Sequence, residues 1–135
     1  MTWAGGAVLL LLLLLIAVQL GPRILARRTV GRSLHGIPGS LGAAIDAGED
    51  VIVVFFGPTC TACRRQEPAV QAVQKDFPSL FLINVPEELS TARTFGVMAT
   101  PTTVLVRNRT IQKVLVGVQS ESTLRSLVQR ARPRR

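Results

Sequence analysis

The sequence predicts an α/β domain with a mixed central sheet flanked by helices, preceded by one N-terminal transmembrane helix. Three observations lead to this prediction: an apolar segment at the start of the chain, alternating strand and helix patterns through the middle, and two strands joined by a short turn near the end. A strand–helix–strand unit followed by a hairpin combines parallel with antiparallel pairing, so the sheet is expected to be mixed.

The apolar segment is long enough to cross a bilayer. From Trp3 to Leu20 every residue except Gln19 is apolar or glycine, and at about 1.5 Å per residue this stretch spans a hydrocarbon core. The alternative is a cleaved signal peptide, which has a basic start, a shorter apolar run and a small-residue cleavage site. Thr2 carries no charge and Gly21-Pro22-Arg23 is a poor cleavage site, so we expect a retained anchor over residues 1–22.

The formal charge of +8 comes from the two ends of the chain. Nine of the 16 basic residues follow the anchor or lie in the last eleven residues: Arg23, Arg27, Arg28, Arg32, Arg125, Arg130, Arg132, Arg134 and Arg135. No aromatic residues are interleaved with these arginines, so we expect no nucleic-acid partner, and anionic lipid head groups suit the two basic flanks better. For the C-terminal run, a solvated tail is an equal alternative.

The expected domain boundaries follow from composition. Residues 23–39 are predicted to form a basic linker, because Gly31–Gly39 contains glycine, proline and polar residues without helical or strand periodicity. The folded domain is expected over 40–131, with a basic tail over 132–135.

Within the domain, Ser40 is expected to cap a helix that runs to Ala47 and ends at Gly48. The apolar run 51–56 predicts a central parallel strand buried on both faces, and helical spacing predicts a helix from Cys60 to Asp76 with a kink at Pro68. The remaining patterns predict a helix over 90–95, a last helix capped by Ser120, and strands over 80–85, 102–106 and 111–116.

The two cysteines lie three residues apart, directly after the buried strand and in the first turn of a helix. That spacing brings both sulfurs to one helix face, within reach of a disulfide. Free amides and the helix dipole stabilise a thiolate at the helix start. Cys60 is therefore expected to be the nucleophile, and Cys63 the thiol that resolves the mixed disulfide.

Other uses of the pair are less compatible with the sequence. A structural zinc site needs four ligands, and the one further soft donor is His35 in the linker, so no metal site is predicted. Idle structural cysteines and a copper(I) site made of two thiolates stay open as alternatives. Neither alternative explains why the pair follows a strand and opens a helix.

From Ser40 to Arg130 the chain resembles the thioredoxin superfamily. The residues that carry the resemblance are the strand before Cys60-Thr61-Ala62-Cys63, Pro68 five residues later, the segment 95–102 with Thr100-Pro101, and Gly117 before the last helix. The resemblance implies a thioredoxin fold, with Pro68 and Gly117 as structural residues and a cis peptide bond before Pro101. It further implies substrate contacts by Thr59, Thr100 and Pro101.

By the same resemblance, the chain would be a protein dithiol–disulfide oxidoreductase that needs no cofactor beyond a redox-active Cys60–Cys63 disulfide and acts on protein thiols and disulfides. Thr59 replaces the family's tryptophan, and Val54 stands where thioredoxins bury an acid, which leaves water or Glu67 to exchange a proton with Cys63. A dedicated thioredoxin-like protein is expected rather than a general thioredoxin. The alternative is a non-catalytic carrier or copper(I) chaperone that presents the pair.

The arginines that follow the anchor, with none before it, predict a domain on the cytoplasmic face by the positive-inside rule. The resemblance favours the opposite side, because membrane-anchored members of the superfamily more often work outside the cytoplasm. We expect the cytoplasmic face, with the extracytoplasmic side as the alternative. Oligomeric state is not predicted.

Overall fold

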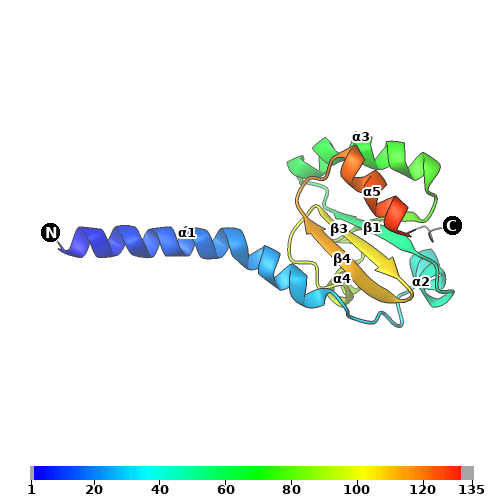
Figure 1. Ribbon diagram of the computed structural model, residues 1–135, viewed down its shortest axis with the longest axis horizontal. Coiled ribbons are helices and arrows are strands. Elements are labelled where there is room, and N and C mark those ends of the chain that lie inside the picture. The colour runs from blue at the N-terminus through cyan, green and yellow to red at the C-terminus, as the bar shows by residue number, and fades with distance from the viewer. Residues whose placement is uncertain (1, 132–135) are drawn as a thin grey trace.

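The computed structural model of the chain describes residues 2–131, in which a long N-terminal helix leads into an α/β domain (Figure 1). The elements, in chain order, are α1 (Thr2–Thr29), α2 (Gly39–Asp46), β1 (Val51–Phe56), α3 (Thr61–Asp76), β2 (Leu80–Asn84), α4 (Leu89–Thr94), β3 (Thr102–Arg107), β4 (Thr110–Val116) and α5 (Glu121–Ala131). Each strand, and each helix from α2 onward, begins within two residues of its predicted start.

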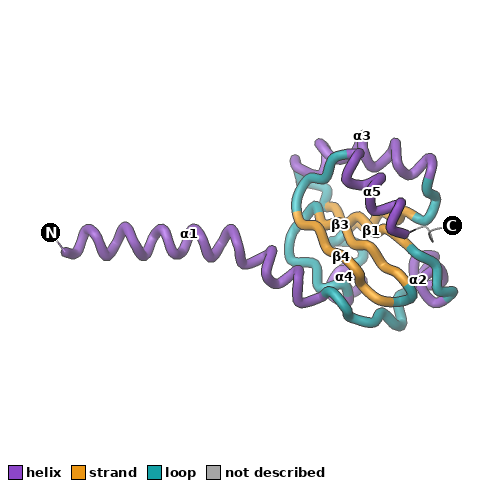
Figure 2. Tube along the Cα trace, viewed as in Figure 1, coloured by secondary structure: helices purple, strands orange, loops and turns teal. Residues whose placement is uncertain are grey.

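The four strands form one mixed sheet in the order β2-β1-β3-β4 (Figure 2, orange). The central strand β1 pairs in parallel with β2 and antiparallel with β3, and β3 continues into β4 through a hairpin. Asn108 and Arg109, at the hairpin turn, both adopt positive φ. The predicted mixed sheet is therefore confirmed.

Helices cover both faces of the sheet, as predicted. Ile52 and Val54 of β1 face α3 and α5, whereas Val51, Val53 and Phe55 face α2 and α4 (Figure 1). All five side chains are buried, because a strand with helices on both faces has no solvent-facing side.

The helix α1 extends away from the domain. Within residues 2–131 it is the one helix long and apolar enough to cross a membrane, by length and composition, and a signal sequence has the same properties. It continues beyond the expected anchor, through Pro22 to Thr29. Figure 1 shows α1 changing direction before it reaches the sheet, as expected of a helix with an internal proline.

The segment 23–39 differs from the expected linker. Residues up to Thr29 are helical, and Gly31 and Arg32 then pair with Ile111 of β4 through two backbone hydrogen bonds, 2.7 and 3.0 Å long. Leu34 is fully buried and belongs to the same apolar cluster as Phe55. The folded unit therefore begins before residue 40, because this segment extends the sheet edge and fills the core beneath α2.

We expect Leu34→Ala to lower the free energy of unfolding by about 3 kcal/mol, because a buried leucine is replaced by a cavity. His35→Ala, one residue later and exposed, is the matched control and should change it by less than about 0.5 kcal/mol. Urea denaturation of the full chain in detergent micelles measures both values. Equal effects of the two variants would show that residues 31–37 are a linker after all.

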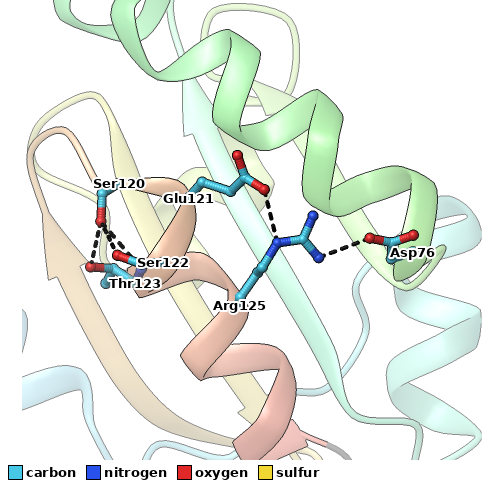
Figure 3. Close-up of polar contacts among 6 residues, drawn as sticks. All are labelled: Asp76, Ser120, Glu121, Ser122, Thr123 and Arg125. Atoms are coloured by element: carbon cyan, nitrogen blue, oxygen red, sulfur yellow. Dashed lines mark hydrogen bonds and ion pairs between the residues drawn. The ribbon is translucent and has the colours of Figure 1, made fainter.

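Two serines, Ser40 and Ser120, are predicted to cap helices, and the structure confirms only the second. Pro38 occupies the N-cap position of α2, where no side chain caps the helix, so the prediction for Ser40 is wrong. The Ser120 cap is confirmed, because its Oγ accepts a hydrogen bond from the amide of Thr123 at 3.2 Å (Figure 3).

Of the C-terminal arginines, Arg125 is engaged within the fold. Its guanidinium joins Asp76 of α3 and Glu121 of α5, each at 2.8 Å (Figure 3). The hydrogen bonds to Asp76 and then to Glu121 raise the pKa of Arg125 above its ordinary value. Arg125 therefore links two helices instead of belonging to a basic tail, and the predicted tail itself lies outside the described residues.

Candidate functional site

The two cysteines lie where β1 gives way to α3. A turn at Gly57–Thr59 ends the strand, and Cys60 becomes the N-cap residue of α3. The backbone amide of Cys63 donates a hydrogen bond to Sγ of Cys60 over 3.1 Å. A sulfur at this position also lies at the positive end of the helix dipole, an arrangement that stabilises a thiolate on Cys60 once the pair is reduced.

Cys60 and Cys63 are joined as a disulfide, with their Cα atoms 5.2 Å apart. Both residues are half-buried, so exposure of the whole residue does not distinguish the two cysteines. Their difference lies in backbone position: Cys60 is the cap, and Cys63 is inside the first turn.

The loop before β3 lies against the disulfide. The Thr100–Pro101 peptide bond is cis, and Pro101 lines the same pocket as both cysteines. A Cβ on Gly57 would lie 3.8 Å from Oγ1 of Thr100 and 3.9 Å from Cβ of Cys60, so the side chains of Thr100 and Cys60 both lie close to this turn. The structure therefore brings Thr100 and Pro101 to the cysteines, 37 or more positions away in sequence.

The sequence also predicts a substrate contact by Thr59 and structural roles for Gly117 and Pro68. Thr59 is exposed next to Cys60. Gly117 has a φ of +95°, and its amide donates to the carbonyl of Pro101 at 2.9 Å, which fixes the loop after β4 beside the site. Pro68 lies inside α3 and is exposed, one helical turn beyond Arg64. The roles of all these residues stay predictions.

A pocket of about 260 Å³ opens beside the disulfide, between β1, β2 and α3. Its apolar lining includes Val54, Val70 and Leu82, and charged groups enter from α3 alone, through Arg64 and Glu67. Val54, which departs from the buried acid of thioredoxins, presents an apolar side chain to this pocket. Among the pocket-lining residues, Glu67 is the one carboxylate.

Gln66 is a site residue that the sequence reasoning missed. It lines the pocket, is 1% exposed, and joins three elements: its Oε1 accepts from the amide of Gln119 at 2.9 Å, and its Nε2 donates to Oγ1 of Thr103 at 3.4 Å. The signal was available, since Gln66 falls on the same helical stripe as Cys63, Val70 and Val73.

Gln66→Leu is expected to lower the free energy of unfolding by about 2 kcal/mol, because the hydroxyl of the buried Thr103 and the half-buried amide of Gln119 would each lose a partner. Gln71→Leu removes only an exposed hydrogen bond to Glu67 and should stay within about 0.5 kcal/mol of the parent. Thermal unfolding of both variants checks the difference. A neutral Gln66→Leu would contradict the bridging role.

Across residues 2–131, no three side chains of histidine, cysteine, aspartate or glutamate gather in a way that would hold a metal ion. The site therefore consists of a disulfide at the start of a helix, a proline loop facing it and a mostly apolar pocket. Disulfide exchange is the chemistry that these groups support directly.

Comparison with known proteins agrees with this chemistry. The Thioredoxin family profile matches residues 41–130. The Disulfide bond formation protein of Brevibacillus choshinensis is 33% identical over 92 residues, covering 65% of this chain and 78% of that protein. The chloroplastic Thioredoxin M4 of Arabidopsis thaliana is 28% identical over 89 residues, or 64% of this chain, and the match spans about half (46%) of the plant protein.

Among solved structures, the thioredoxin of Fasciola hepatica superposes with a TM-score of 0.61 at 27% identity, covering 68% of this chain and 91% of that one. The fold, the CxxC disulfide and these relatives together indicate a thiol–disulfide oxidoreductase. The chain belongs to the thioredoxin family.

Proposed function

We propose that this protein is a membrane-tethered oxidoreductase that exchanges disulfides with protein substrates, using Cys60 as the attacking thiol and Cys63 as the resolving one. The observation that carries the proposal is the hydrogen bond from the Cys63 amide to Sγ of Cys60 at the start of α3. That donor stabilises negative charge on Cys60 and on no other sulfur.

The reaction follows from this geometry. In the reduced form, the Cys60 thiolate attacks a client disulfide, forms a mixed disulfide and releases one client sulfur as thiolate. Cys63 then loses its proton and attacks Sγ of Cys60, which re-forms the Cys60–Cys63 disulfide and releases the reduced client. Two electrons pass to the client, and the reverse sequence oxidises it.

The proton that leaves Cys63 needs an acceptor in the pocket. Val54 and Leu82 offer none, whereas the carboxylate of Glu67, one turn after Cys63, lines the same pocket. Water or Glu67 therefore receives this proton, and Thr100 and Pro101 hold the client backbone beside the sulfurs.

The tether is α1. Its exposed apolar side chains, from Val8 to Leu20, would be costly in water and are suited to a bilayer. The arginines after it favour the cytoplasmic face by the positive-inside rule, and they support a contact of the basic flanks with anionic lipid.

The test uses the full chain in detergent micelles with a peptide disulfide as substrate and a small dithiol as reductant. Turnover that is lost in Cys60→Ser supports the proposal. Tight copper(I) binding without exchange would favour a carrier instead.

A second experiment tests on which side of the membrane the domain lies. Intact cells are labelled with a membrane-impermeant thiol reagent before and after permeabilisation, and reaction in intact cells would overturn the cytoplasmic assignment.

A further inference from the structure

We propose that the disulfide faces the bilayer surface from which α1 emerges, and that the preferred clients are integral membrane proteins that present a cysteine close to the lipid head groups. This inference rests on the proposed tether and on the proposed exchange activity. It adds the class of client, which neither of them specifies.

The first observation is where α1 meets the domain. Pro22 and Ala26 of α1 line a small pocket together with Met98 and Ala99, which directly precede Thr100 and Pro101 of the site loop. The helix therefore meets the domain first at the loop that lies against the disulfide, and it then runs along β4 toward Ile111, to which Gly31 is bonded.

The topology places the redox site at the same end. The amide of Gly117, which follows β4, is bonded to Pro101, and Val114 and Val116 of β4 line the pocket that contains Pro22. In Figure 1 the β4 arrow points toward the side on which α1 extends from the domain. The end of the sheet that carries the disulfide therefore faces the bilayer.

The second observation is that the connection is stiff. The helix runs without a break to Thr29, and Gly31 pairs with β4 two residues later. Arg32 adds a hydrogen bond to the carbonyl of Thr94 at 3.2 Å. A Cβ on Gly96 would overlap the Thr29 side chain, so α1 and the loop after α4 are in close contact. No flexible spacer lets the domain swing away.

The third observation is the short distance from the bilayer. The apolar run ends at Leu20, and Pro22 already lines a pocket with Met98 and Ala99 of the site loop. Residues 21 and 22 add only about 3 Å along the helix, which is less than the roughly 5–8 Å of one head-group layer. Met98 is 70% exposed and Val118 is 46% exposed, so apolar side chains border the site where it approaches the membrane.

A client cysteine that lies just outside the bilayer can reach the disulfide without any movement of the domain. A soluble client has to enter the space between the domain and the lipid surface. Confinement near the membrane raises the effective concentration of a membrane protein's cysteine at the site. Membrane-protein clients are therefore preferred because the distance between the disulfide and the bilayer is fixed.

The orientation is tested by fluorescence quenching in liposomes of phosphatidylcholine and phosphatidylglycerol. The full chain carrying Cys60→Ser and Cys63→Ser receives one labelled cysteine, either Met98→Cys at the site or Glu49→Cys, an exposed position just before β1 at the opposite end. A head-group-attached quencher should quench the label at 98 several-fold more than the label at 49. Equal quenching, or stronger quenching at 49, overturns the proposal.

The client preference is tested with two reconstituted single-span peptides that carry the same peptide disulfide, one directly after the span and one after about 20 Gly and Ser residues, which extend roughly 25 Å. We expect exchange to be about tenfold faster with the near peptide. The same flexible insert between Leu20 and Gly21 should abolish the difference, whereas the insert appended after Arg135 should preserve it.

Equal rates with the two peptides in the parent protein overturn the client assignment while leaving the exchange activity intact. Loss of exchange with both peptides, and also with a soluble peptide disulfide, means that the proposed function has failed. Removal of α1 during maturation, seen by N-terminal sequencing of the purified protein, would contradict the tether separately.

Discussion

Replacing Cys60 with serine is expected to lower the rate of disulfide exchange by roughly a thousandfold or more, because a hydroxyl does not replace a thiolate as the attacking group. Cys63→Ser should have a different effect. The first attack by Cys60 remains, since the Cys63 backbone amide that stabilises its sulfur is unchanged, but the reaction stops at the mixed disulfide.

Single-turnover experiments with a peptide disulfide separate the two variants. Cys63→Ser should release the first client thiol at a rate near that of the parent and then retain the peptide covalently. Cys60→Ser should do neither. The opposite assignment, with Cys60→Ser retaining the peptide and Cys63→Ser inert, would mean that the attacking and resolving thiols are exchanged.

Gly42→Ala is expected to lower the free energy of unfolding by about 3 kcal/mol, at the upper end of the usual cost of overpacking. Gly42 is buried in α2, and a Cβ there would overlap the backbone carbonyl of Ile37. Backbone cannot move aside as a flexible side chain does, so α2 would have to separate from the segment 34–37 that it covers.

The matched control is Ser40→Ala in the first turn of the same helix. Ser40 makes no capping hydrogen bond, so its removal should change the free energy of unfolding by less than about 0.5 kcal/mol, against about 1 kcal/mol for a true cap. Urea denaturation of both variants provides the comparison. A Gly42→Ala protein as stable as the parent would contradict the close packing of α2 on residue 37.

Most of the fold could be predicted because its signals are local. Val51–Phe56 is an uninterrupted β-branched and aromatic run with a glycine and proline directly after it, and helices on both faces require such a run. The cysteine pair could be placed for the same reason: strand, turn and helix are adjacent in sequence, so the helix start and the sulfurs coincide.

The segment 31–37 could not be predicted because its signal is not local. Leu34 and Ile37 are two apolar residues among glycines and polar groups, too few for any periodicity. Their place in the core depends on the open edge of β4, which supplies backbone partners, and on α2, which covers them. Pro22 is a second example of a position that local sequence does not decide. Proline ends many helices, but Pro22 lies inside α1, which continues to Thr29.

The candidate site was predicted only in part. Thr100 and Pro101 were placed by resemblance, since nothing in their local sequence links them to Cys60. The pocket that Val54, Leu82 and Glu67 share could not be foreseen, because its walls come from three elements. Gln66 is not predicted as a site residue, because a glutamine on a helix is usually exposed. Its burial follows from partners on β3 and the loop after β4.

The most direct test of thiol–disulfide exchange by this protein is covalent trapping in cells. Full-length Cys63→Ser is expressed, thiols are blocked by acid and alkylation, and the membrane fraction is separated without reductant. We predict higher-mass species that contain the protein, disappear on reduction, and are absent from the variant lacking both cysteines. If Cys63→Ser migrates as the free chain alone, or if the double variant gives the same species, the proposed exchange through Cys60 is contradicted.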